Sequence, residues 1–335
     1  MELVLGVDAG GSKTLAVVAE PGGRVTGVGR AGGANFQACG RAGARGQLAR
    51  AVSAALSQAG AGSESIAAAC FGVAGADRPR DFATIEAFTR DLVPAARYRL
   101  ENDSLVALRA GTADGVGIAL IAGTGSNAVG RNAAGEKLQV GGLGRLSGDW
   151  GSAWQLGEQA VVAAMMARDG RGPATALQQD ICRRLGLDDI LDVIEYDFYD
   201  HDGPPLDLGA LAPLVFAAAG RGDEVAAEIL RRAGARVARA AAVIADRLFP
   251  GRDDFPVVFG GAVFQRGSHP LLVDTVRQLL RNDYPGARFV RLRVAPVLGA
   301  VAWAADALGP PGGGEELVER LADSWPEAAA EEKQS

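Results

Sequence analysis

The stretch "GVDAGGSKT", residues 6–14, decides the fold class of this chain. A short apolar run leads into Asp8, two adjacent glycines and Ser-Lys-Thr, and a second strand-like run follows. Glycine lets a turn approach a ligand closely, and successive backbone N–H groups with nearby hydroxyls bind anions. An ordinary β-hairpin explains the same pattern. A Walker A loop and a Rossmann fingerprint are excluded, because both require a helix where this chain predicts a strand.

The same pattern recurs in the middle of the chain. Residues 3–8, 14–20 and 24–30 read as three strands joined by turns, and "IALIAGTGSNAVG", residues 118–130, again reads as strand, glycine-rich turn and strand. An internal duplication explains both. We therefore predict an α/β protein with two lobes and a central cleft. The expected lobes are 1–115 and 116–295, and the tail at 326–335 is expected to fray.

The composition of the 335-residue chain limits its function. Apolar residues make up 48% of the sequence, and the net charge of −6 argues against a nucleic-acid groove, which needs a basic face. No apolar run has the length of a membrane span, and no signal peptide is recognisable. The scattered Cys39, Cys70 and Cys182 are expected to be reduced. We expect a cytoplasmic protein without membrane or nucleic-acid partners.

Four further sites lie at predicted strand or helix ends. Asp103 ends a short strand and is suited to accept a proton from a hydroxyl, or simply to cap a helix. Asp149, in "GGLGRLSGDWGSAW" (141–154), is suited to bind two sugar hydroxyls or to cap a helix. Asn35 offers a comparable amide. Gly260 and Gly261 allow either the approach of a flat ring or a tight helix entry.

Taken in order, these segments resemble the sugar kinase/Hsp70/actin superfamily, and more narrowly the BadF/BadG/BcrA/BcrD ATPase family, which includes N-acetylglucosamine and glucosamine kinases. "DAGGSKT" (8–14) and "AGTGSNAVG" (122–130) are similar to the two phosphate loops of the family, and "FGGAVF" (259–264) to its adenosine segment. "END" (101–103) carries the acid that is the base in the kinases, and "SGDWGSA" (147–153) resembles the block whose Asp binds the sugar.

The resemblance, over about residues 3–308, implies a duplicated actin-like ATPase (ribonuclease H-like) fold, in which residues 296–325 return to the first lobe, and a homodimer. It implies transfer of the γ-phosphoryl group of Mg-ATP to a hydroxyl, O6, of N-acetylglucosamine, glucosamine or a related hexose. Asp103 is the implied catalytic base, and Asp8 the implied ligand of hydrated Mg²⁺. The implied ATP-binding residues are Asp8, Gly10, Gly11, Ser12, Lys13, Thr14, Thr124, Gly125, Gly260 and Gly261. The implied sugar-binding residues are Asn35, Asp103, Ser126, Asn127, Gly142, Leu143, Gly144 and Asp149.

Two positions depart from the kinase pattern and leave the sugar open. Leu143 stands where the kinases commonly have Trp, and Trp150 follows Asp149 where they often have a polar residue. Two other classes compete with the kinase. An activator-type ATPase of the family needs cysteines for an iron–sulphur cluster, and the second lobe has Cys182 alone. A sugar-binding regulator needs a helix-turn-helix segment, for which the first strand at residue 3 leaves no room.

Overall fold

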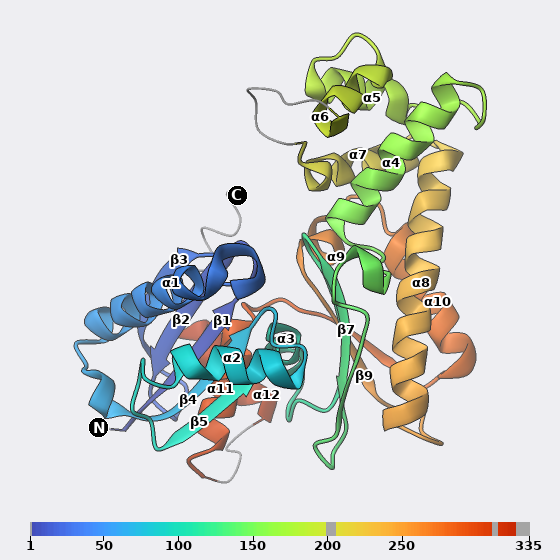
Figure 1. Ribbon diagram of the computed structural model, residues 1–335. Coiled ribbons are helices and arrows are strands. Elements are labelled where there is room, and N and C mark those ends of the chain that lie inside the picture. The colour runs from blue at the N-terminus through green and yellow to red at the C-terminus, as the bar shows by residue number, and fades with distance from the viewer. Residues whose placement is uncertain (1, 199–205, 310–313, 326–335) are drawn as a thin grey trace.

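The computed structural model describes residues 2–198, 206–309 and 314–325. Two mixed sheets of five strands form its frame (Figure 1). The first sheet has the strand order β3-β2-β1-β4-β5, and the second has the order β10-β9-β6-β7-β8. The strands of the first sheet are β1 (Leu3–Ala9), β2 (Lys13–Ala19), β3 (Val25–Gly32), β4 (Ile66–Val73) and β5 (Arg97–Glu101). Those of the second are β6 (Gly117–Ala122), β7 (Ser126–Arg131), β8 (Lys137–Val140), β9 (Pro256–Gly260) and β10 (Arg288–Arg291).

The two sheets share one internal plan. In the first, β1, β2 and β3 form an antiparallel meander, while β4 and β5 run parallel to β1. In the second, β6, β7 and β8 form the meander, while β9 and β10 run parallel to β6. Every strand of one sheet therefore has a counterpart of the same order and direction in the other. The predicted α/β class and internal duplication are confirmed.

Helices cover both faces of the first sheet. Helices α1 (Phe36–Ala59) and α2 (Pro79–Thr89) share a hydrophobic core with one face, and α3 (Asp103–Ala110) and α11 (Val297–Asp306) with the other. Figure 1 places α3 between the two lobes. The helix predicted at residues 40–59 begins four residues earlier, and Gly40, with φ of 71°, breaks its regular backbone. The free thiols are unevenly placed, since Cys70 is buried but Cys39 is exposed.

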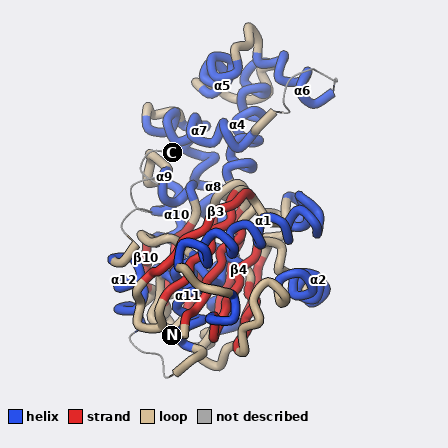
Figure 2. Tube along the Cα trace, turned by 90° about the vertical axis from the view of Figure 1, so that its left-hand side faces the viewer, coloured by secondary structure: helices blue, strands red, loops and turns tan. Residues whose placement is uncertain are grey.

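The second lobe carries a larger helical part. Helices α8 (Glu224–Leu248) and α10 (Leu271–Asp283) pack together, and α8 lies against β6, β7 and β8. Four helices extend beyond the strands, as Figure 2 shows: α4 (Ala153–Arg168), α5 (Leu177–Leu185), α6 (Glu195–Phe198) and α7 (Ala212–Gly220). The buried strand expected over 256–264 ends at Gly260, because Gly261 has φ of 89° and α9 (Ala262–Arg266) follows. Strand β10 was not anticipated.

The end of the chain contributes to the core of the first lobe. Helix α11 packs on β1, β4 and α3, and the side chains of α12 (Gly314–Asp323) join the same core. After α12, the Ser324 hydroxyl accepts a hydrogen bond from the backbone N–H of Val25 at 3.0 Å. The exact lobe boundaries at residues 115 and 295 stay a prediction, and the tail at 326–335 lies outside the described residues.

Two glycines allow α11 to lie this close. A Cβ atom at Gly6 would be 2.4 Å from the backbone nitrogen of Val301, and one at Gly299 would be 2.1 Å from the carbonyl oxygen of Val106. A side chain at either position would force the backbones apart. The fully buried Arg109 of α3 adds a polar contact, since its Nε donates to Asp306 Oδ2 of α11 at 3.2 Å.

We expect Gly6→Ala to lower the free energy of unfolding by about 1–3 kcal/mol, because overpacking strains a dense core. Denaturant unfolding followed by circular dichroism measures the change. Gly46→Ala is the control, since Gly46 lies in α1 and a Cβ there would have no neighbour within 4 Å. That control should be neutral or slightly stabilising. Equal stability of Gly6→Ala and the wild type would contradict the close approach.

Candidate active site

Three aspartates gather at one edge of the first sheet. Strands β1, β4 and β5 run parallel, so their carboxyl ends meet at the same edge, where open α/β sheets bind ligands. Asp8 lies near the end of β1, Asp77 follows β4, and Asp103 follows β5 as the first residue of α3. All three are partly buried. The topology thus explains how residues far apart in sequence come together.

The first glycine-rich turn joins β1 to β2 beside this edge. The backbone N–H of Gly10 donates to the carbonyl of Lys13 at 2.9 Å, which closes the turn, and Gly11 and Ser12 are exposed. The following segment supports the turn from behind, because a Cβ at Gly33 would be 2.0 Å from the Gly11 carbonyl oxygen. The turn is therefore exposed to solvent on one side and held in place by the segment around Gly33 on the other.

The second glycine-rich turn has the equivalent place between β6 and β7. The backbone N–H of Gly123 donates to the carbonyl of Gly125 at 2.8 Å, and Thr124 and Gly125 are exposed. Asn127, two residues after this turn, donates from Nδ2 to the Ser104 hydroxyl at 3.0 Å. Ser104 directly follows Asp103. The second turn is thereby connected to the helix that carries Asp103.

Asp8 lies close enough to Asp103 for the charge of Asp103 to oppose its ionisation. Burial raises the pKa of Asp8 to about 7, with a further contribution from the charge of Asp103 and a weaker opposing one from Lys13. Burial likewise raises the pKa of Asp103 to about 6, and the charge of Asp77 adds to this against hydrogen bonds from Ser104. Two carboxylates that share a poorly solvated site favour a bound cation.

Asp149 organises the loop between β8 and α4. Its carboxylate accepts hydrogen bonds from the backbone N–H groups of Gly142 and Gly144, each at 2.8 Å, and from the Ser147 hydroxyl at 2.5 Å. Leu143, between these glycines, is exposed. The predicted sugar-binding carboxylate therefore holds its own loop together, and a ligand would have to replace these donors.

A pocket of about 290 Å³ brings several predicted sugar-binding residues together. Ser126, Asn127, Gly142 and Asp149 all line it. Trp150 also lines the pocket, and its ring lies 5.3 Å from the guanidinium carbon of Arg236 on α8. The tryptophan that departs from the kinase pattern therefore packs against an arginine of the same lobe.

The remaining predicted site residues have structural contacts of their own. Thr14 is fully buried and donates its hydroxyl to the carbonyl of Gly32 at 2.8 Å, so in this structure it joins β2 to β3. The Asn35 side chain caps α1 by accepting from the backbone N–H of Gln37 at 2.9 Å. Gly260 is buried, and a Cβ at Gly261 would be 2.3 Å from the Ala122 carbonyl oxygen, so strand packing alone requires a glycine there. Their predicted ligand contacts stay predictions.

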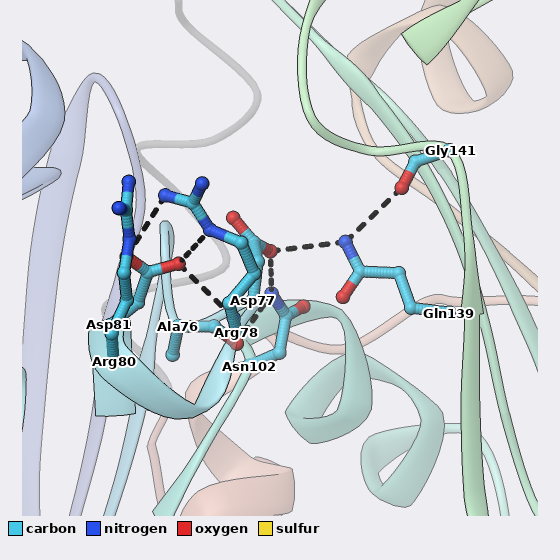
Figure 3. Close-up of polar contacts among 8 residues, drawn as sticks. All are labelled: Ala76, Asp77, Arg78, Arg80, Asp81, Asn102, Gln139 and Gly141. Carbon is cyan, nitrogen blue, oxygen red and sulfur yellow. Dashed lines mark hydrogen bonds and ion pairs between the residues drawn. The ribbon is translucent and has the colours of Figure 1, made fainter. Parts of the chain in front are cut away.

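Three polar residues that the sequence analysis did not select also belong to the site. The Asp77 carboxylate accepts hydrogen bonds from Asn102 and from Gln139, each at 3.0 Å (Figure 3). Two signals were available in the sequence. Asp77 comes after a buried strand, as Asp103 comes after a strand, and Lys137 and Gln139 are two residues apart and so share one face of a short strand.

Comparison with known proteins identifies the family. The model of the BadF/BadG/BcrA/BcrD ATPase family matches residues 5–304. The chain belongs to this family. Recognition of the BadF/BadG/BcrA/BcrD pattern from the motifs is thus confirmed.

Relatives of known function agree with this assignment. The chain is 30% identical to an N-acetylmuramic acid/N-acetylglucosamine kinase of Clostridium acetobutylicum, over 90% of this chain and 97% of that protein. It is 28% identical to an N-acetyl-D-glucosamine kinase of Dictyostelium discoideum, over 89% and 96%. The predicted enzyme class of this BadF/BadG/BcrA/BcrD member, a sugar kinase, is confirmed by these relatives.

Solved structures support the fold. A candidate N-acetylglucosamine kinase of Chromobacterium violaceum matches with a TM-score of 0.69 and 26% identity, over 90% of this chain and 98% of that one. A glucokinase of the ROK family from Streptomyces griseus matches with a TM-score of 0.53 and 20% identity, over 92% and 100%. The actin-like fold predicted for this BadF/BadG/BcrA/BcrD member is confirmed. None of the helices in the described part of the chain has the length and apolar character of a membrane span.

We expect Asp8→Asn to raise the melting temperature of the ligand-free protein at pH 8 by at least about 2 °C. The folded pKa of Asp8 lies above its unfolded value of 3.8, so ionisation favours unfolding, and its cost is complete above pH 7 and vanishes as the pH falls toward 4. Calorimetry in the presence of a chelator at pH 8 and pH 4.5 measures both limits. Asp188→Asn, at an exposed position, is the control. A lower melting temperature for Asp8→Asn at pH 8 would contradict the electrostatic strain.

Proposed function

We propose that this sugar kinase transfers the γ-phosphoryl group of Mg-ATP to the O6 hydroxyl of an amino sugar, N-acetylglucosamine, glucosamine or a related hexose such as N-acetylmuramic acid. We further propose that it works in the cytoplasm as a homodimer. The single observation that carries this proposal is the position of Asp103. Its charge acts on Asp8, which lies just before one glycine-rich turn, and its neighbour Ser104 accepts a hydrogen bond from Asn127, which lies just after the other.

The exposed turns are suited to bind a polyphosphate from two sides. The backbone N–H groups of Gly11, Ser12 and Thr124 and the hydroxyls of Ser12 and Thr124 are hydrogen-bond donors that can orient phosphate oxygens. Phosphoryl transfer depends on such positioning and on charge neutralisation more than on covalent help. The two turns are therefore suited to position the phosphates for the reaction.

Asp103 supplies the proton acceptor. With a pKa of about 6 it is ionised at neutral pH, yet it remains basic enough to take a proton. As the sugar oxygen forms its bond to the γ-phosphorus, its proton passes to Asp103, and the bond between the γ-phosphorus and the bridging oxygen breaks. The electron pair of that bond leaves with ADP.

Asp8 is the residue that would hold Mg²⁺, through bound water. Its partly buried carboxylate opposes that of Asp103, and a cation relieves this repulsion. Among the residues that the structure describes, no group of three or more acidic, His or Cys side chains forms a metal cage. This suits Mg²⁺, which is usually bound by one or two carboxylates together with substrate phosphates. When bound, Mg²⁺ would neutralise the charge that develops on the phosphates.

A screen for ADP release tests the proposal directly. The sugars are N-acetylglucosamine, glucosamine, N-acetylmuramic acid, N-acetylmannosamine and glucose, each with Mg-ATP. Turnover of at least one amino sugar is expected, and Asp103→Asn should lower kcat by about 10³-fold or more while the fold is retained. For the wild type, kcat/KM should fall as the pH drops below about 6, where Asp103 becomes protonated. Near-normal turnover by Asp103→Asn would reject its role as the base.

Asp149→Ala tests the predicted sugar contact separately. We expect its Kd for the sugar to rise by at least about 10-fold, because lost charge-assisted hydrogen bonds weaken binding by about 1.5–3 kcal/mol. The Kd for ATP should change less than twofold. Titration calorimetry with each ligand measures both values, and Asp188→Ala is the control. Weaker ATP binding with unchanged sugar binding would contradict the assignment.

A further inference from the structure

We propose that Asp77 is a positioning residue that bridges the two lobes and fixes Asp103 relative to the loop of Asp149. Its effect on turnover rests on the proposed function, but the bridge itself does not. One carboxylate oxygen, Oδ1, accepts from Asn102 Nδ2 in the first lobe and from Gln139 Nε2 in the second, each at 3.0 Å. Figure 3 shows Asp77 between these two amides. The second oxygen takes no part in this bridge.

On the side of the first lobe, the bridge reaches Asp103 through Asn102. The Asn102 side chain is buried, and its Oδ1 accepts from the backbone N–H of Ser104 at 2.9 Å. That bond caps α3, whose first residue is Asp103. Asp77 accepts from the Nδ2 group of the same Asn102 amide, so it fixes the orientation of that amide. Loss of Asp77 would leave the Asn102 Nδ2 group with only its longer hydrogen bond to the Ala76 carbonyl, at 3.4 Å, and so loosen the cap.

On the side of the second lobe, the bridge reaches the loop of Asp149 through Gln139. The same Nε2 group donates to the carbonyl oxygen of Gly141 at 3.2 Å, where the loop begins. The next residue packs against this amide, since a Cβ at Gly142 would be 2.8 Å from Gln139 Nε2 and 2.2 Å from Asn127 Oδ1. The Gly142 N–H then donates to Asp149. A continuous set of contacts therefore joins the two predicted catalytic and sugar-binding carboxylates.

Neighbouring contacts fix the bridge at both ends. Arg78 pairs with Asp81 at the start of α2, with Nε 2.7 Å from Oδ2, and so holds the segment that follows Asp77 (Figure 3). Lys137, two residues before Gln139 on β8, pairs with the buried Glu101 at 2.6 Å. Lys137 and Gln139 lie on the same side of this edge strand and both contact the first lobe. The lobes thus meet through specific polar groups next to Asp103.

Two substitutions at residue 77 separate position from charge. Asparagine keeps an acceptor oxygen for both amides, whereas alanine removes it. We expect Asp77→Ala and Gln139→Ala each to lower kcat by about 10- to 100-fold, since small misplacements of reacting groups have effects of this size. The KM for ATP should change less than twofold. Asp77→Asn should stay within about threefold of the wild type, and the double alanine variant should be no worse than the poorer single one, because both act on one bridge.

Hydrogen exchange tests the bridge without any substrate. In the full chain, Asp77→Ala should speed exchange in peptides that cover residues 102–106 and 141–149, and Asp77→Asn should not. Asp188→Ala and Gln179→Ala, both at exposed positions, are the matched controls. Thermal unfolding checks that each variant is folded, and Gln139→Ala remains informative if Asp77→Ala is not.

The outcomes that overturn the inference are distinct. Unchanged exchange of both peptides in Asp77→Ala would refute the bridge, whether or not the enzyme phosphorylates a sugar. An equal loss of kcat in Asp77→Asn and Asp77→Ala, with a raised KM for the sugar, would make Asp77 a direct sugar ligand through its charge. Failure of the wild type to phosphorylate any sugar would contradict the proposed function but not the bridge. The hydrogen-exchange result then tests the bridge independently.

Discussion

The burial of two carboxyl groups, Asp8 and Asp103, at one sheet edge is the constraint on which the site depends. Burial raises the pKa of both carboxyl groups, and the charge of Asp103 raises that of Asp8 further. The fold keeps both groups in this poorly solvated place, because the parallel strands β1 and β5 bring them to the same sheet edge. A cation binds to such a site more readily than to well-solvated carboxylates, since its charge offsets theirs and allows a phosphate to lie nearby.

The rest of the molecule resists the separation of these groups. Glycines at Gly6 and Gly299 let α11 lie directly on β1 and α3, so the elements that carry Asp8 and Asp103 share one dense core. The second lobe adds contacts through amides and through the ion pair of Lys137 with Glu101. Packing holds both carboxylates in the first lobe, and polar contacts between the lobes set their distance from the loop of Asp149 in the second.

Much of this arrangement could be predicted from sequence, for identifiable reasons. Asp8 and the two glycine-rich turns were recognisable because a turn that must approach a ligand requires glycine in a local pattern. Gln139 and Asp77 were not selected, because their contact joins segments far apart in the sequence and each of them left only a weak local signal. Gly261 illustrates a third case, since the glycine was predicted for an adenosine site, yet packing against Ala122 already requires it. Strand β10 has four residues and little apolar alternation, so it left no clear signal.

The return of α11 and α12 to the first sheet has a consequence for biosynthesis. One face of that sheet is covered by residues from the last part of the chain, including Val301, Leu321 and Trp325. During translation this face stays uncovered until the whole second lobe has been synthesised, which takes roughly 10 to 40 s at ordinary elongation rates. The nascent first lobe therefore leaves the ribosome with an apolar surface open to chaperones, and a message truncated before α11 would yield an incomplete core and an aggregation-prone product.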